Sequence, residues 1–375
     1  MRSQRKIKIA FLNDSSRIGG AERSLALLIR NLNHKLFETL VICPKEGPFI
    51  EELERQNINV IPMDINHFSR KHRPFNYIIS LFKLLYIIRR LKVDIIHCNS
   101  IRAAHWGVPI GKILSKKTFC HIRSSDYTKF SSFIVRSISK DSEFIAISKF
   151  VKKSLRDRGV LDNKITIIYN GVDDDLYSPY ISLEIFEREF PIYKKVLKIG
   201  IIGRIEDWKR HIDVIEATGI IKKDIDFHLF IVGEVWNSKD FNILQTLKSR
   251  IIDLELENRV TFTGFRRDIP ELIAGLDVII VPSINEPFGR VTIEAMAIGK
   301  PVIGTISGCT PEVIQDGING ILVPVKDPAA IAKAIQYLAN NPEHAARLGR
   351  EARKRVVETF SIRRHVMLVQ NLYMK

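Results

Sequence analysis

Residues 278–305 read VIIVPSINEPFGRVTIEAMAIGKPVIGT. Residues 278–281 form a short, apolar, β-branched run, which is typical of a buried parallel strand. Residues 285–289 indicate a tight loop, and the apolar side chains over residues 290–298 predict a helix that packs on both sides. A second strand follows at residues 302–304. The stretch therefore predicts a strand, a loop, a helix and a strand, which is the repeating unit of α/β folds.

Two carboxylates eight residues apart are the chemically distinctive feature of this stretch. Glu286 lies in the loop and Glu294 inside the first helical turns, so both can face one cleft and touch different parts of an elongated ligand. The backbone N–H groups of Phe288, Gly289 and Arg290 at the helix start would favour an anion. A pair of glutamates alone would also fit a capped helix with one exposed side chain, so the surrounding string decides the interpretation.

The string from Glu286 to Val302 resembles the signature E-P-F-G-x-x-x-x-E-A-M-A-x-G-x-P-V of the family 4 retaining glycosyltransferases. The resemblance implies the GT-B fold, in which two doubly wound, Rossmann-like parallel-sheet domains face each other across a cleft. It also implies that Glu286 sits beside the donor sugar and that Glu294 holds the ribose hydroxyls of the nucleotide.

Further strings in the second half support the same resemblance. Gly203-Arg204 followed by Lys209 resembles the donor-phosphate motif of the family, and this cation pair can neutralise a diphosphate, whereas two arbitrary bases would be solvated at the surface. The string ending at Gly264 resembles V-x-F-x-G, after which the backbone of Phe265 and Arg266 is expected to meet the nucleobase.

The first half matches the family more loosely. A strand over residues 7–12 is followed by Gly19-Gly20 and a helix, an arrangement that can bind phosphate, although a plain tight turn fits a Gly-Gly pair as well. The resemblance to the family string G-G-x-E favours a ligand-facing loop. No G-x-G-x-x-G string is present, so a dinucleotide fingerprint is not supported.

Two histidines stand near the ends of predicted strands, where sites form in α/β folds. A single histidine is more often a hydrogen-bonded structural group, and this is our interpretation of His97. For His121 the resemblance implies a position near the C6 hydroxyl of the donor sugar.

The chain predicts two domains. Six strands alternate with helices in about 170 residues, which indicates a doubly wound sheet. The predicted N-terminal, acceptor-binding domain spans residues 1–175, joined by a final helix over about residues 358–375. Residues 176–195 are expected to be a linker with no clear apolar period. The predicted C-terminal, nucleotide-sugar-binding domain spans residues 196–357, and residues 328–340 and 343–372 are predicted to be helical.

Composition bounds the class of protein. The chain has 375 residues, 45% of them hydrophobic and 27% charged, which is typical of a soluble globular protein. No apolar run reaches about 18 residues and the N-terminus lacks a signal-peptide core, so we expect no spanning helix and a cytoplasmic location. Four scattered cysteines without a C-x-x-C pair indicate a reducing compartment and no structural zinc.

The net charge of +16 is concentrated in the first half. Residues 1–180 hold 31 Lys and Arg against 17 Asp and Glu, and the remainder holds 27 against 25. No nucleic-acid-binding motif accompanies this charge, so we expect no nucleic-acid partner and favour an anionic membrane surface or an acidic acceptor. The basic, apolar residues 68–92 fit a helix lying on the inner face of the cytoplasmic membrane. A core helix with solvated bases at its ends fits them equally well.

These observations lead to one hypothesis and two alternatives. The chain is expected to be a retaining glycosyltransferase that moves a hexosyl unit from a nucleotide-diphosphate sugar to a glycan or lipid-linked glycan, in cell-surface polysaccharide biosynthesis. UDP-sugars are favoured and GDP-mannose is second; no cofactor or metal is expected, because no D-x-D string stands in a convincing metal-site context. The alternatives are a catalytically silent sugar-nucleotide-binding partner and a GT-B sugar-nucleotide epimerase.

Overall fold

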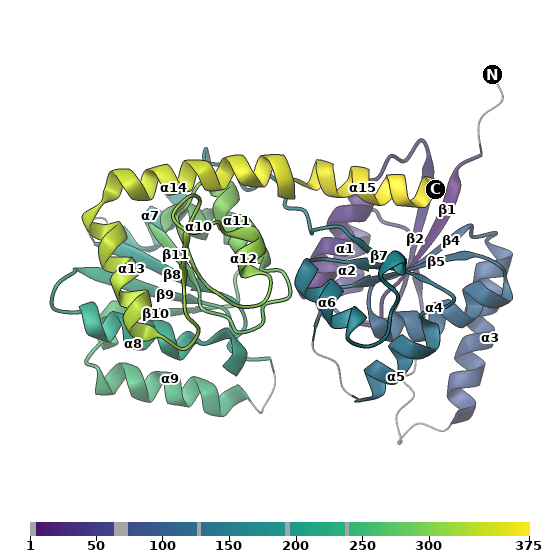
Figure 1. Cartoon of the computed structure of the whole chain (residues 1–375), viewed down its shortest axis with the longest axis horizontal. Helices are drawn as coiled ribbons and strands as arrows, with labels where there is room; N and C mark the ends of the chain where they lie inside the picture. The colour runs from purple at the N-terminus through teal and green to yellow at the C-terminus, as the bar shows by residue number, and fades with distance from the viewer. Residues whose placement is uncertain (1–4, 64–73, 126–128, 192–195, 237–239) are drawn as a thin grey trace. The chain divides into compact units, whose positions relative to one another are not determined.

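The computed structural model describes residues 5–63, 74–125, 129–191, 196–236 and 240–375 (Figure 1). The chain forms two compact units, residues 1–171 with 362–375 and residues 172–361. The first unit therefore ends four residues before the expected boundary at residue 175. The last helix, which begins at Ile362, belongs to the first unit again.

Within the described residues, the sheet of the first unit has seven parallel strands in the order β3-β2-β1-β4-β5-β6-β7, one more than predicted. Its strands are β1 (Ile7–Leu12), β2 (Phe37–Cys43), β3 (Val60–Pro62), β4 (Ile95–Cys98), β5 (Lys117–Ile122), β6 (Glu143–Ala146) and β7 (Ile165–Ile167). The central strands are almost wholly buried, as expected for a parallel sheet that is covered on both faces.

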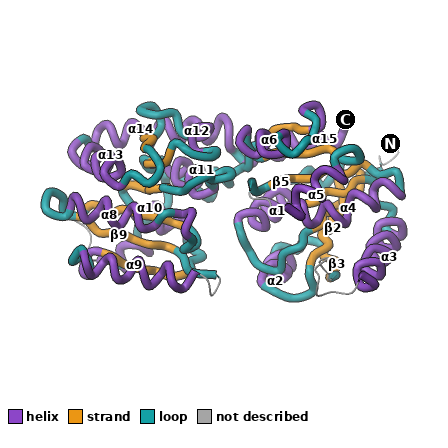
Figure 2. The backbone as a smooth tube through the Cα atoms, turned by 60° about the horizontal axis from the view of Figure 1, so that its bottom comes forward, coloured by secondary structure: helices purple, strands orange, loops and turns teal. Residues whose placement is uncertain are grey.

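Helices provide that cover (Figure 2). They are α1 (Gly20–Asn31), α2 (Pro48–Arg55), α3 (Pro74–Arg90), α4 (Ile101–Ile113), α5 (Lys129–Ile138), α6 (Lys149–Arg156) and α15 (Ile362–Met374). On one face, α1, α2 and α15 share a hydrophobic core with the strands. On the other face α4 lies directly against the sheet, because Gly107 has no Cβ, and a Cβ there would lie 2.4 Å from Cys98 Sγ.

In the described part of the second unit, six parallel strands form a sheet in the order β10-β9-β8-β11-β12-β13. They are β8 (Leu197–Ile202), β9 (Phe227–Val232), β10 (Val260–Gly264), β11 (Val278–Val281), β12 (Val302–Thr305) and β13 (Ile321–Val323). The helices are α7 (Glu184–Glu189), α8 (His211–Ile221), α9 (Phe241–Asp253), α10 (Ile269–Gly275), α11 (Arg290–Ile298), α12 (Thr310–Val313), α13 (Pro328–Asn340) and α14 (Pro342–Arg355). The prediction of two doubly wound parallel sheets is thus confirmed.

The described part of the expected linker (176–195), residues 176–191, belongs to the second unit. It contains α7, whose Phe186 is buried with its ring centroid 5.5 Å from that of Phe230. Gly275 makes room for this ring, because a Cβ there would lie 2.1 Å from it. A six-residue helix with one buried side chain leaves no apolar period, so the sequence did not reveal it.

The expected single helix over residues 343–372 was wrong as well. A π-helical turn (Val356–Phe360) follows α14, and Ser361 is then extended, with φ −66° and ψ 149°. Ser361 forms a β-bridge with Val172, and Val172 N donates to Phe360 O at 2.9 Å. This pairing interrupts the helix where the chain leaves the second unit.

The structure describes most of the helix predicted over residues 68–92, as α3. Three basic residues of the predicted helix lie outside the described residues: Arg70, Lys71 and Arg73. Among the helices of the described residues, none combines the length and the apolar character that crossing a membrane requires.

Candidate active site

The strand order of the second unit places β8 beside β11, and the chain proceeds from these neighbours toward opposite edges of the sheet. Ligands of open α/β sheets bind outside the carboxyl ends of the strands at such a switch point. The loop after β8, residues 203–209, carries Arg204 and Lys209. The loop after β11, residues 282–289, carries Glu286. The topology thus gathers three of the predicted site residues at one end of the sheet.

Two glycines let neighbouring loops touch at this edge. Gly203 and Gly233 have positive φ angles of 153° and 139°, and Gly203 N donates to Val232 O at 2.9 Å. A Cβ on Gly233 would lie 2.0 Å from Gly203 O, so only glycine fits. The loop that carries Arg204 is therefore packed directly on the loop after β9.

Arg204 is held by a carboxylate and an aromatic ring. Its Nη1 lies 2.9 Å from Glu206 Oε1, and its guanidinium carbon lies 4.7 Å from the ring centroid of Trp236. Glu206 also accepts a hydrogen bond of 2.7 Å from Trp208 Nε1. Trp236, in the loop after β9, therefore supplies a ring beside the cation.

Lys209 and Glu286 form the central contact of the site. Lys209 Nζ lies 2.6 Å from Glu286 Oε2, and the two side chains are only 18% and 9% exposed. The ammonium also lies 4.2 Å from the ring centroid of Trp208. Ile284 N donates to Trp208 O at 2.8 Å, which ties the two loops together. The predicted phosphate-binding cation and the predicted sugar-binding carboxylate are thus in direct contact.

The backbone of Glu286 is fixed by the chain that follows β12. Cys309 N donates to Glu286 O at 2.8 Å, and Asn285 N donates to Ser307 Oγ at 2.8 Å. Gly308 lies so close that a Cβ there would be 2.4 Å from Glu286 O. Asn285 itself adopts a left-handed φ of 55°, a conformation that asparagine tolerates. These contacts orient the Glu286 side chain toward Lys209.

Helix α11 begins at this loop and carries the second carboxylate. Gly289, its N-cap, has a φ of 81°, and the preceding Phe288 is buried beside Phe360. Arg290 Nη2 lies 2.7 Å from Glu294 Oε1, and the Glu294 side chain is 5% exposed. The sequence analysis gave a role only to the backbone of Arg290, and the structure shows that its side chain pairs with the buried Glu294. Each carboxylate of the signature thus has its own cation.

The third loop of this sheet follows β10. Gly264 has a φ of 69° and Phe265 is exposed. The Arg266 guanidinium bonds to Glu189 at 2.5 and 2.6 Å and to Asp268 at 2.7 and 2.9 Å. The hydrogen bonds that Arg266 donates to the carboxylates of Asp268 and Glu189 raise its pKa further above the ordinary value. The Arg266 side chain is therefore fully engaged with these two carboxylates. The predicted contact with the nucleobase is left to the backbone of this loop.

In the first unit, the predicted Gly19-Gly20 loop starts α1, with Gly19 as the N-cap. Gly19 N donates to Glu22 Oε2 at 2.9 Å, and burial raises the pKa of Glu22. The glutamate of the G-G-x-E string therefore caps its own helix.

His121 is fully buried in β5. Its Nδ1 lies 3.3 Å from His97 Nε2 and 3.3 Å from Arg123 Nη2. Because a guanidinium only donates, Nδ1 accepts and the ring proton is on Nε2, which has no hydrogen-bond partner among the described residues. Burial lowers the pKa of His121 well below its ordinary value, so the ring is neutral.

The structural interpretation of His97 is confirmed. It is completely buried, and its Nδ1 lies 2.7 Å from the hydroxyl of Tyr373 on α15. Burial lowers the pKa of His97 well below its ordinary value. The neutral imidazole therefore links the last helix to β4 and β5.

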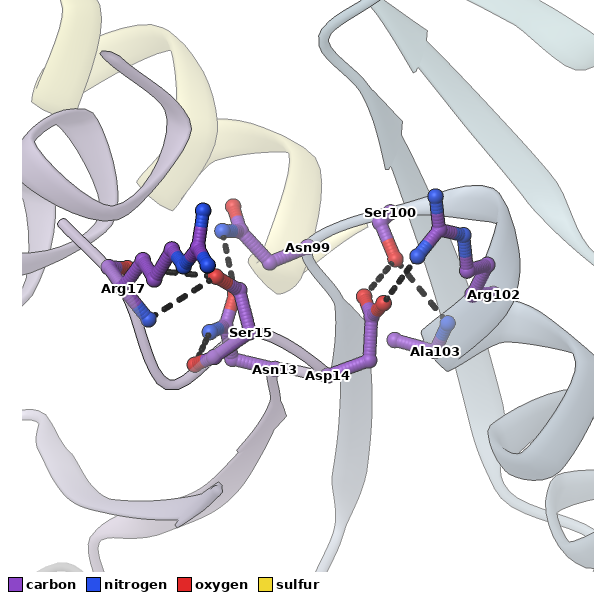
Figure 3. Close-up of polar contacts among 8 residues, drawn as sticks. All are labelled: Asn13, Asp14, Ser15, Arg17, Asn99, Ser100, Arg102 and Ala103. Atoms are coloured by element: carbon purple, nitrogen blue, oxygen red, sulfur yellow. Dashed lines mark hydrogen bonds and ion pairs between the residues drawn. The ribbon is translucent and has the colours of Figure 1, made fainter. Parts of the chain in front are cut away.

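The first sheet also has a switch point, between β1 and β4, and Figure 3 shows the polar contacts there. The Asp14 carboxylate accepts a hydrogen bond from Ser100 Oγ and lies 3.7 Å from Arg102 Nη1. Asn99 Nδ2 donates to Asn13 Oδ1 at 2.9 Å. The loops after β1 and β4 are thereby joined at the carboxyl end of the sheet.

Arg123 extends this network across the sheet. Its Nε donates to Asn99 Oδ1 at 2.7 Å and its Nη1 to Asn170 Oδ1 at 2.6 Å. The sequence analysis assigned no role to Arg123 or Asn170, because they lie 47 positions apart with no local pattern between them. Their position directly after β5 and β7 was the only available signal.

The second unit thus presents two cations, a helix N-terminus and two buried carboxylates at one end of a parallel sheet. Cations and amides suit a diphosphate, and carboxylates suit vicinal hydroxyls. Together with the two doubly wound units, this site defines a transferase of the GT-B architecture.

Comparison with known proteins places the chain within that class. Residues 18–176 match the family model described as Glycosyltransferase Family 4, and residues 184–355 match the model described as Glycosyl transferases group 1. The chain belongs to this family of glycosyltransferases.

Three similar proteins match this chain over most of their own length and most of its length. N-acetyl-alpha-D-glucosaminyl L-malate synthase of Bacillus anthracis is 28% identical over 334 residues, 84% of each chain. The UDP-Gal:alpha-D-GlcNAc-diphosphoundecaprenol alpha-1,3-galactosyltransferase of Escherichia coli is 23% identical, over 98% of this chain and 97% of that protein. The crystal structure of Anabaena Alr3699/HepE in complex with UDP-glucose is 25% identical, with a TM-score of 0.86 over 98% and 99% of the two chains.

Proposed function

We propose that the protein transfers a hexosyl unit from a UDP-sugar to a glycan or lipid-linked glycan, with retention of the anomeric configuration. The observation that carries this proposal is the contact between Lys209 and Glu286, at 2.6 Å, with Arg204 in the same loop as Lys209. A diphosphate that approaches these cations brings its attached sugar to Glu286.

The proposed chemistry is the departure of the nucleotide diphosphate. Arg204, Lys209 and the backbone amides at the start of α11 stabilise the negative charge that develops on the leaving group. Glu286 orients the sugar and does not attack it, and the acceptor hydroxyl attacks from the face that the leaving group vacates. Glu294, fixed by Arg290, accepts hydrogen bonds from the ribose hydroxyls.

Uridine is the favoured base, with GDP-mannose as the second candidate. Two relatives support this choice: the Anabaena protein binds UDP-glucose in its crystal structure, and the E. coli enzyme carries UDP-Gal in its name. The name of the E. coli enzyme also gives a diphosphoundecaprenol acceptor, which supports a lipid-linked acceptor in cell-surface polysaccharide biosynthesis.

We further propose that transfer needs no metal ion. The candidate D-x-D string, Asp224 and Asp226, precedes β9 and thus lies at the amino end of the sheet, opposite the cations. Asp224 accepts a hydrogen bond from Gln336, and Asp226 lies 3.8 Å from Arg259. Lys209 and Arg204 supply positive charge at the end where the diphosphate would bind.

A cytoplasmic location at the inner face of the membrane follows from a lipid-linked acceptor and from the basic first half of the chain. The silent-partner alternative is disfavoured because Arg204, Lys209, Glu286 and Glu294 are all present. The epimerase alternative requires no acceptor, and product analysis without acceptor separates it.

The test is a transfer assay with UDP-glucose, UDP-galactose and GDP-mannose, with and without a lipid-linked acceptor analogue and with EDTA. We expect acceptor-dependent release of UDP, unchanged by EDTA, and an α-linked product in its NMR spectrum. Glu286→Gln should lose most transfer while still binding UDP. Full transfer by Glu286→Gln would refute the orienting role, and inversion at the anomeric carbon would refute retention.

A further inference from the structure

Helix α3 (Pro74–Arg90) presents an exposed apolar face. Ile78 is 48% exposed, Ile79 37%, Phe82 65% and Tyr86 61%. At 100° per residue these four side chains fall within one side of the helix. We call them the outer face of α3.

The opposite side of the same helix is anchored in the first unit. Ser80, Leu84 and Ile88 are buried, and the ring of Tyr77 lies 4.2 Å from that of Trp106 on α4. The buried side of α3 therefore anchors the helix to the first unit, and the outer face takes no part in this packing. Aromatic and aliphatic side chains that remain exposed on a helix already packed on its other side need a separate explanation.

The charged side chains of α3 are all positive. Lys83, Arg89 and Arg90 are exposed, and residues 74–90 contain no Asp or Glu. The Arg90 guanidinium lies 5.8 Å from the ring of Tyr86. An apolar stripe with an interfacial tyrosine and flanking cations is the composition of helices that lie in the headgroup region of anionic membranes.

We propose that the outer face of α3 docks the protein on an anionic lipid surface, with the helix parallel to the membrane plane. This inference rests on the proposed function, because a lipid-linked acceptor is presented at such a surface. Phe82, Tyr86 and the two isoleucines enter the acyl boundary, and the three cations meet lipid phosphates.

A second copy of the chain fits the outer face less well. Pairing two α3 helices through this face would oppose three cations with three more, with no carboxylate on either helix to compensate. A bilayer that contains acidic lipid offers both the apolar layer and the negative charge. On such a bilayer the exposed rings contact the apolar layer while the cations contact the acidic headgroups.

The experiment is cosedimentation with phosphatidylcholine vesicles that contain or lack phosphatidylglycerol, at low and high salt. We expect the wild type to bind only the anionic vesicles and to be released by salt. Lys83→Gln with Arg89→Gln and Arg90→Gln should weaken binding on the order of 100-fold. Phe82→Ser with Tyr86→Ser should weaken it by about tenfold or more.

A matched control is available in the second unit, on α9. Phe241 and Ile252 are 55% and 61% exposed, so Phe241→Ser with Ile252→Ser removes equally exposed apolar side chains from another helix. This variant should bind vesicles like the wild type. Equal binding by the Phe82→Ser, Tyr86→Ser variant would overturn the proposal, and so would a wild type that ignores anionic vesicles or uses this face to dimerise in solution.

Failure of docking and failure of the proposed function are separable. Stabilisation by UDP and transfer to a detergent-dispersed acceptor do not need a membrane. A protein that keeps both but does not bind vesicles refutes only the docking surface. A protein that binds vesicles through α3 but neither binds a nucleotide sugar nor transfers one refutes the proposed function.

Discussion

Both units are doubly wound parallel sheets, but the side chains at their switch points differ. At the switch point of the second sheet, buried charges face each other in pairs, Lys209 with Glu286 and Arg290 with Glu294. At the switch point of the first sheet, amides join the charged groups: Asn13 bonds to Asn99, and Asn99 accepts a hydrogen bond from Arg123. From this difference we propose that the second unit binds the charged donor and that the first contributes hydrogen bonds to the acceptor.

The largest expected effect comes from breaking an ion pair of the second unit. Lys209→Ala should lower kcat/KM for the donor by roughly 100- to 1000-fold, because it removes a charge that stabilises the leaving group. Steady-state kinetics of UDP release measure this. Lys222→Ala, which removes a surface cation paired with Glu255, is the matched control and should retain wild-type kinetics. Comparable losses in both variants would contradict the assignment of Lys209.

A smaller effect is expected from the other pair. Glu294→Gln should raise the KM for the UDP-sugar by roughly 10- to 100-fold, because a neutral amide replaces a charged acceptor of the ribose hydroxyls. It should also reduce discrimination against a 2′-deoxy donor, which a general loss of folding would not do. Glu255→Gln, at an exposed position, is the control. Unchanged discrimination would show that Glu294 does not contact the ribose.

The neutral histidines of the first unit predict a pH dependence of stability. Burial holds the pKa of His97 and His121 well below 6.5, so the unfolded chain binds protons that the folded unit does not. Stability is therefore fully present above about pH 6.5 and falls below it, by up to about 1.4 kcal/mol per pH unit for each histidine.

The second unit contributes to the same slope. Burial lowers the pKa of His211 to about 3 and that of His228 to about 4. Urea unfolding between pH 7 and about pH 4 should show a slope that His97→Gln with His121→Gln reduces. An unreduced slope would contradict the contribution of His97 and His121.

The smallest effect tests the independence of the two switch points. Ser100 caps α4 by accepting a hydrogen bond of 3.0 Å from Ala103 N, and it also bonds to Asp14. Ser100→Ala should lower the free energy of unfolding by about 1 kcal/mol while leaving the affinity for UDP unchanged. Urea unfolding and calorimetric titration measure these two quantities, and a parallel loss of UDP affinity would contradict the separation.

The sequence predicted best where structure is set locally. The helix predicted over residues 290–298 is α11, and the strands on either side of it are β11 and β12. The motif residues Lys209 and Glu286, 77 positions apart, were brought together by a family resemblance and by the rule for switch points.

Contacts without a local pattern were missed. The bond between Tyr373 and His97 spans 276 positions, and that between Arg123 and Asn170 spans 47. The break at Ser361 depends on its bridge to Val172. Such features arise from tertiary packing inside each unit and are absent from periodicity and spacing.

The most direct test of the central claim is thermal unfolding of the wild type and Arg204→Ala with UDP, GDP and their sugars. Ligand at about 100 times its Kd stabilises by about 2.7 kcal/mol, which is easily measured. The account predicts that uridine ligands raise the Tm of the wild type and that Arg204→Ala abolishes the shift. Equal stabilisation of both proteins, or no stabilisation by any nucleotide, would contradict it.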